Sequence, residues 1–146
     1  MPDQSEQSTE RQRRGAIGVL VRDDGRLLVI ERSQFVRAPG RFCFPGGGIE
    51  EGESEEAAVR RELIEELNLQ VDPLRRLWQS ETRSGIQLNW WLVQLSPAHQ
   101  EPRPNLREVA RCFWMERFEI TRRRETLSSN RKFLAAVETG EIDFSH

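Results

Sequence analysis

Carboxylates are the side chains of this sequence that are best placed to do chemistry. Eight glutamates fall between residues 50 and 66, and Glu62, Glu65 and Glu66 have the i, i+3, i+4 spacing that shares one face of a helix. Like charges at this spacing repel one another. Such an oxygen-rich cluster suits Mg²⁺ or Mn²⁺, and Mg²⁺ binds through a few carboxylates together with substrate phosphates. The cluster therefore predicts a phosphate ester or anhydride as substrate; the alternative is an ordinary solvated acidic face.

A helix has to position these glutamates. Ser54 is a predicted N-cap, and the helix is expected to run to Leu67 and to stop at Asn68, which tolerates a left-handed C-cap. Val59, Leu63 and Leu67 are four residues apart and form an apolar stripe beside the acidic face. The helix can thus bury one side and turn its carboxylates toward the preceding glycine-rich loop.

The other elements follow from periodicity and turn residues. We expect strands over 16–21, 27–30, 41–44, 74–81, 86–95 and 109–115, irregular backbone over 45–48, a surface loop over 96–105 and a closing helix over 130–139. The first two strands are expected to pair as a hairpin. This pattern predicts an α+β fold of the αβα sandwich type. Residues 1–13 are predicted to be a disordered polar tail, and residues 14–146 a single domain.

Composition excludes several classes of function. The 146 residues carry 22 basic and 24 acidic side chains, a balance that predicts neither a nucleic-acid nor a membrane partner. His99 and His146 are the only histidines and Lys132 is the only lysine, so catalysis by a histidine triad or a Schiff base is not expected. Cys43 and Cys112 have no metal-binding spacing, and the first thirty residues contain no apolar signal core. We expect a cytoplasmic protein, as a monomer or homodimer.

The glycine loop and the acidic helix together resemble the signature of the Nudix hydrolases. That signature is Gly-x5-Glu-x7-Arg-Glu-U-x-Glu-Glu-x-Gly-U, where U is a bulky aliphatic residue. This sequence reads Gly47-x5-Glu53-x7-Arg61-Glu62-Leu63-x-Glu65-Glu66-x-Asn68-Leu69. The one departure is Asn68, which stands where the family has a helix-capping glycine. Further similarity lies in Phe44-Pro45-Gly46-Gly47, in Glu50–Glu53 and in the Glu-x5-Trp pattern from Glu108 to Trp114.

The resemblance implies a Nudix fold, with a mixed central sheet flanked by helices, and roles for the matching residues. Glu62, Glu65 and Glu66 would be metal ligands, and the backbone carbonyl of Gly46 would join them. Arg61 would pair with Glu53 and orient the carboxylates, and we count both residues and Glu62 among the catalytic candidates.

The family commonly supplies one more glutamate from a separate loop, as metal ligand or general base. Glu108, six residues before Trp114, is the best match; Glu81 and Glu101 are the other candidates. A plain surface charge is the alternative interpretation of Glu108.

The activity that the resemblance implies is hydrolysis of a diphosphate linkage, by attack of water at phosphorus in a nucleoside diphosphate derivative. All box carboxylates are present, which favours turnover over a nucleotide sensor of the same fold or an acidic scaffold. Arg32 and Arg37 are candidates for binding substrate phosphates, and Trp90 for stacking on a base; surface charge and core packing are the alternatives. Residues 28–47 have partial similarity to the coenzyme A pyrophosphatase signature, so the substrate stays open.

Overall fold

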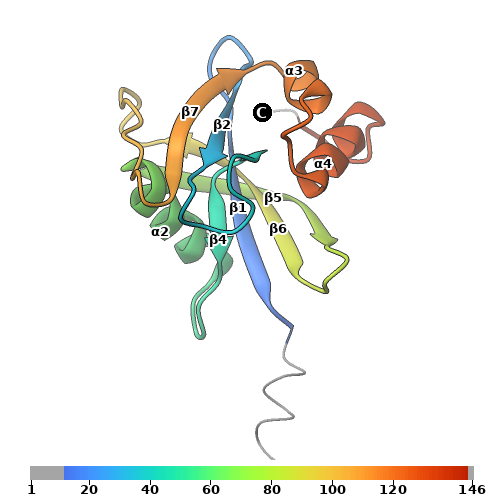
Figure 1. Ribbon diagram of the computed structural model, residues 1–146, viewed down its shortest axis with the longest axis horizontal. Coiled ribbons are helices and arrows are strands. Elements are labelled where there is room, and N and C mark those ends of the chain that lie inside the picture. The colour runs from blue at the N-terminus through green and yellow to red at the C-terminus, as the bar shows by residue number, and fades with distance from the viewer. Residues whose placement is uncertain (1–11, 145–146) are drawn as a thin grey trace, which may run out of the picture.

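The computed structural model describes residues 12–144, so the predicted polar tail falls almost wholly outside the described residues. The described residues form seven strands and three helices, whose arrangement Figure 1 shows. The strands are β1 (Arg14–Leu20), β2 (Leu27–Arg32), β3 (Phe42–Cys43), β4 (Gly46–Gly48), β5 (Val71–Glu81), β6 (Gln87–Leu95) and β7 (Val109–Met115). The helices are α2 (Glu55–Leu67), α3 (Arg117–Arg122) and α4 (Ser128–Glu138). Within residues 12–144, no helix is long and apolar enough to span a membrane.

The strands form two sheets, ordered β4-β1-β6-β5 and β3-β2-β7. Strands β1 and β6 run parallel and the other neighbours run antiparallel, so the predicted mixed sheet is confirmed. The predicted hairpin of the first two strands is wrong, because β1 and β2 lie in different sheets and only Val21 bridges to Leu27. Instead, β1 has a strand neighbour on each edge, β4 and β6, and nearly all of it is buried. The predicted irregular backbone at 45–48 is also wrong at β4, which pairs with β1.

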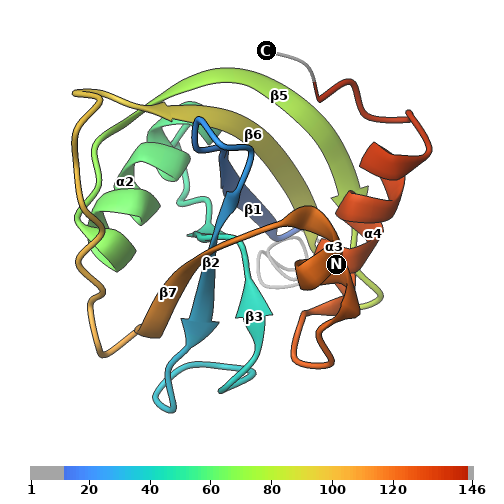
Figure 2. The ribbon, with the colours of Figure 1, turned by 90° about the horizontal axis from the view of Figure 1, so that it is seen from above.

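Figure 2 shows α2 on one side of the strands and α3 and α4 on the other. A hydrophobic cluster lies on each side of the sheets. One cluster contains Trp90 stacked on Phe133 of α4, with ring centroids 4.7 Å apart. The other contains the apolar stripe of α2, whose Leu63 is fully buried. This arrangement confirms the predicted αβα sandwich. Helix α3 was not predicted; its six residues are too few to show a periodic apolar face.

Helix α2 begins and ends where the sequence predicts. The Ser54 hydroxyl accepts a hydrogen bond from the N–H of Ala57, and Asn68 adopts the left-handed conformation with a φ of 55°. Leu63 packs so closely on β1 that a Cβ at Gly18 would lie 2.9 Å from its Cδ2 atom. Glu55, at the first turn, accepts hydrogen bonds from Arg76 of β5. The helix is therefore fixed against the sheet at its start and along its apolar face.

Candidate metal centre

Glu62 and Glu66 lie between α2 and the glycine strand β4, and both side chains are buried. The N–H of Gly46 donates a 2.8 Å hydrogen bond to Oε1 of Glu66. A Cβ on Gly47 would lie 2.5 Å from the carboxyl carbon of Glu62. Gly47 therefore allows Glu62 to approach the backbone more closely than any other residue would permit.

The hydrogen-bond alternation of β4 directs part of its backbone away from β1. Gly18 donates to the carbonyl of Pro45, and Ile49 donates to the carbonyl of Arg14. In an antiparallel pair such bonded positions alternate with unbonded ones, and in this register Gly46 and Gly48 take the unbonded positions. Their carbonyls thus face outward, and that of Gly48 accepts a 2.9 Å bond from Arg61. The Gly46 carbonyl is on the same edge as Glu66, as its predicted role requires.

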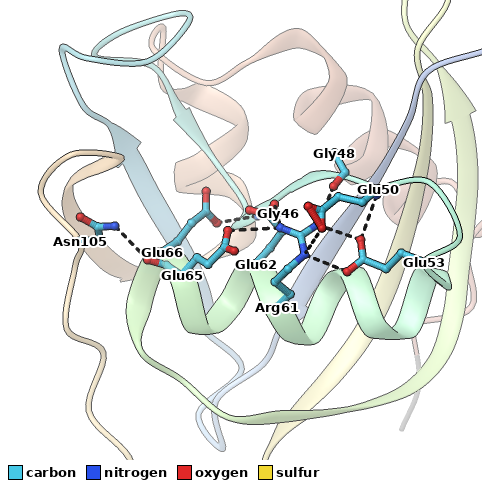
Figure 3. A network of polar contacts seen from close by, with 9 residues as sticks. All are labelled: Gly46, Gly48, Glu50, Glu53, Arg61, Glu62, Glu65, Glu66 and Asn105. Atoms are coloured by element: carbon cyan, nitrogen blue, oxygen red, sulfur yellow. Dashed lines mark hydrogen bonds and ion pairs between the residues drawn. The ribbon is translucent and has the colours of Figure 1, made fainter.

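Arg61 ties the glutamates of the loop to those of the helix, as Figure 3 shows. Its guanidinium binds both carboxylate oxygens of Glu53, at 2.8 and 2.9 Å. The same group reaches Oε1 of Glu62 at 2.9 Å and Oε2 of Glu65 at 3.2 Å. The predicted Arg61–Glu53 fork is therefore present. Arg61 also folds back along its own helix, so the acidic face has a basic partner within α2.

The contacts between Arg61 and Glu53 shift the pKa values of the two residues in opposite directions. Hydrogen bonds from Arg61 and from the backbone of Glu50 hold the pKa of Glu53 at about 2. The pKa of Arg61 is raised by Glu53 and Glu62 in return. Glu53 and Arg61 are thus a fixed ion pair at neutral pH, whereas Glu62 and Glu65 each give one oxygen to Arg61 and Glu66 gives none.

Glu108 reaches this site from the loop that precedes β7. Its charge acts on both Glu62 and Glu66. Its Oε2 atom is buried and, among the described residues, has no hydrogen-bond partner. An unpartnered carboxylate oxygen beside two other acids is costly without a compensating positive group. Glu81 lies at the end of β5 beside Gln12, and Glu101 lies by Arg22. Of the three loop candidates, Glu108 is the one that the fold brings to Glu62 and Glu66.

Glu62 and Glu66 resist ionisation. Burial, above all, and the neighbouring charges of Glu62 and Glu108 raise the pKa of Glu66 to about 8. Burial also raises the pKa of Glu62, against the opposing effect of Arg61. These residues fit a bound divalent cation, which would satisfy the free oxygen of Glu108 and offset the repulsion. Within residues 12–144, no three such side chains are already arranged as a complete ligand set. Arg61 holds Glu65 aside, and this half-exposed side chain would have to rotate.

The three predicted substrate contacts are placed very differently. Arg32 lines a pocket of about 450 Å³ and acts electrostatically on Glu66, and its Nε atom donates to the carbonyl of Arg37. The side chain of Arg37 is exposed. Trp90 is fully buried and donates its indole N–H to Ser80, so its predicted stacking on a base is wrong and the core alternative holds.

Two residues near Arg32 were not found from the sequence. Phe35 and Leu106 are 70% and 67% exposed and line the same pocket from separate loops. Exposed large apolar side chains that gather at one place mark binding surfaces. In the sequence each is an isolated apolar residue within a polar loop, and no local signal joins them.

Comparison with known proteins identifies the type of domain. The family model described as the NUDIX domain matches residues 11–137. A "MutT-like protein" of Streptomyces ambofaciens is 40% identical over 73 residues, which cover 49% of this chain and 45% of that protein. The "Putative 8-oxo-dGTP diphosphatase 2" of Mycobacterium tuberculosis is 46% identical over 48 residues, 33% of this chain and 34% of that one. The chain thus matches less than half the length of either relative.

Among solved structures, the MutT protein of Methanosarcina mazei Go1 is similar in fold. It superposes with a TM-score of 0.77 at 18% identity, over 90% of this chain and 97% of that one. At this identity the likeness establishes a shared fold.

Proposed function

This chain belongs to the Nudix hydrolase family, and we propose that it hydrolyses the diphosphate linkage of a nucleoside diphosphate derivative with a divalent cation. The observation that carries the proposal is the meeting of Glu62, Glu66 and Glu108 beside the Gly46 carbonyl. Two buried acids and a half-buried third, whose buried oxygen has no partner among the described residues, are unfavourable as a purely structural arrangement, but they suit a cation that arrives with a polyphosphate.

Glu62, Glu65 and Glu66 would hold the cation, with the Gly46 carbonyl and, as a further ligand, Glu108. Mg²⁺ is our first choice and Mn²⁺ the second, because both prefer oxygen ligands. When bound, such an ion neutralises phosphate charge and lowers the pKa of water.

The chain's own residues supply positioning and proton transfer. In the alternative role to that of ligand, as the general base, Glu108 would accept a proton from the attacking water through its free Oε2 atom. Arg61, held by Glu53, would keep Glu62 and Glu65 in place through its second pair of hydrogen bonds. Arg32, and Arg37 beside it, would bind substrate phosphates. Positioning of the reactants and electrostatic stabilisation account for most of the rate acceleration in phosphoryl transfer.

The substrate class that we propose is a nucleotide, a nucleotide sugar or a dinucleotide. The pocket beside Arg32 supports this choice, because Phe35 and Leu106 offer apolar walls for a base next to a phosphate-binding cation. The name of the M. tuberculosis relative points to the same class. As parts of the same proposal, the protein acts in the cytoplasm, as a monomer or homodimer, on a small phosphate anhydride. The free thiols of Cys43 and Cys112 support a reducing compartment.

The test is a hydrolysis panel with Mg²⁺, in which nucleoside triphosphates, nucleotide sugars, dinucleotides and coenzyme A are each incubated with the protein. Glu65→Gln and Glu66→Gln are expected to abolish turnover and to keep the thermal unfolding cooperative. Glu56→Gln is the matched control, since Glu56 is an exposed residue of the same helix. Full activity of both site variants would refute the metal site. Tight nucleotide binding without release of product by the wild type would favour the alternative, a nucleotide sensor of the same fold.

A further inference from the structure

Asn105 joins the end of α2 to the loop that carries Glu108. The last carbonyls of a helix have no partner within the helix. Here the side-chain amide of Asn105 donates to the carbonyl of Glu65 at 3.2 Å, and its backbone N–H donates to the carbonyl of Glu66 at 2.8 Å. These are two of the positions whose side chains we propose as metal ligands; Figure 3 shows Asn105 beside them.

The same residue forms the turn that leads into β7. The carbonyl of Asn105 accepts hydrogen bonds from the N–H groups of Glu108 and Val109, at 2.9 and 2.8 Å. Its side-chain oxygen accepts from the N–H of Arg107 at 3.2 Å. One residue therefore binds the helix through its donors and the Glu108 turn through its acceptors.

The loop needs a connection to the helix because repulsion between acidic side chains would otherwise move it away. Glu108 faces Glu62 and Glu66, and the repulsion among the three acids favours outward movement of the loop. Within the turn itself apolar burial is small, since Leu106 is 67% exposed and the buried residues begin at Val109.

Other contacts hold the same segment, since the N–H of Arg103 donates to the carbonyl of Leu67 and Ser33 donates to the carbonyls of Arg107 and Glu108. Asn105 is the residue that hydrogen-bonds both the end of α2 and the Glu108 turn.

We infer that Asn105 is a positioning residue, which sets the distance from the carboxylate of Glu108 to those of Glu62 and Glu66. The inference rests on the proposed function, because it matters when Glu108 serves the metal site. Asn105→Ala removes only the two side-chain hydrogen bonds, to Glu65 and Arg107, and leaves the backbone bonds in place.

The experiment is a double-mutant cycle of Asn105→Ala and Glu108→Gln in the full chain. Two quantities are measured for each variant: the affinity for Mn²⁺ by calorimetry, and kcat at saturating metal. Gln100→Ala is the matched control, because Gln100 also links this loop to the backbone, through Gln70, without contact with the Glu108 turn. Thermal unfolding of every variant separates loss of function from loss of fold.

Glu108→Gln is expected to lower the Mn²⁺ affinity or kcat. We expect Asn105→Ala to lower whichever of the two Glu108→Gln lowers, by about tenfold or more, as do changes in residues that support metal ligands. The double variant should be no worse than Glu108→Gln alone, and Gln100→Ala should stay near the wild type. Effects that multiply, an Asn105→Ala variant that matches Gln100→Ala, or a Glu108→Gln variant without effect would each overturn the inference. If the wild type hydrolyses nothing in the panel, the proposed function fails, and Mn²⁺ affinity alone decides the role of Asn105.

Discussion

Gly47→Ala separates the chemistry of the site from the stability of the fold. A Cβ at this position would lie 2.5 Å from the carboxyl carbon of Glu62 and 2.6 Å from both its oxygens. Ordinary contact begins near 3.4 Å, so the carboxylate has to retreat by roughly 1 Å. That end of the side chain is flexible, and the backbone of Gly47 lies outside the left-handed region. The fold can therefore accept the methyl group, whereas Glu62 cannot keep its place.

The size of the effect follows from this displacement. A misplacement of about 1 Å in a catalytic group costs on the order of 100-fold in rate. By contrast, replacing glycine by alanine at a permitted conformation stabilises a protein by about 0.4–1 kcal/mol through the unfolded state. We therefore expect kcat to fall on the order of 100-fold while the melting temperature stays the same or rises slightly.

The assay is steady-state hydrolysis of the best substrate from the panel, alongside thermal unfolding. Gly48→Ala is the control, since a Cβ at Gly48 meets nothing within 4 Å. Its carbonyl can still accept the hydrogen bond from Arg61. Wild-type kcat in Gly47→Ala would refute the reasoning, and so would an equal loss of kcat in Gly48→Ala.

Three further changes test other parts of the account. In Arg61→Lys the lysine cannot form the two hydrogen bonds that Arg61 makes with Glu53, so kcat should fall about tenfold or more. Thermal unfolding should show that the fold is retained. An unchanged kcat would contradict the orienting role of Arg61. Burial raises the pKa of Glu66 from an ordinary 4.5 to about 8 in the metal-free protein, so the native state keeps a proton that the unfolded state releases. Stability without metal should therefore fall as pH rises from about 4.5 to 8, and Glu66→Gln should flatten this slope in denaturant titrations; an equal slope in both proteins would refute the assignment. Phe35→Ala should raise KM about fivefold at constant kcat, which corresponds to the loss of about 1 kcal/mol of stacking, and a fall in kcat alone would argue against a base at this position.

The elements that were predicted correctly are those whose limits are set locally. Helix α2 is fixed by the side chain of Ser54 at one end and by the left-handed Asn68 at the other, and both signals lie in the sequence next to the helix. Strand β7 runs from Val109 to Met115, as its pattern indicates. The hairpin failed for the opposite reason. A turn at Gly25 is present, but the choice of partners for β1 depends on β4 and β6, which are far away in the chain.

Among the residues of the candidate site, those set by local sequence were likewise the ones predicted. The spacing of Glu62 and Glu66 and the fork of Arg61 on Glu53 come from one loop and one helix, so a linear motif predicts them. Residues whose role depends on a distant loop leave no such pattern. Asn105 meets α2 only because the chain returns after β6, and nothing in its local sequence indicates this contact.

A crystal structure with Mn²⁺ and a non-hydrolysable nucleotide tests the central claim most directly. Anomalous scattering from manganese would locate the ion without reference to any expected geometry. Our account predicts a peak bounded by the carboxylates of Glu62 and Glu66 and the carbonyl of Gly46, with Glu65 released from Arg61 and turned toward it. A peak elsewhere, or an unchanged Arg61–Glu65 pair with no ion beside β4, would contradict it.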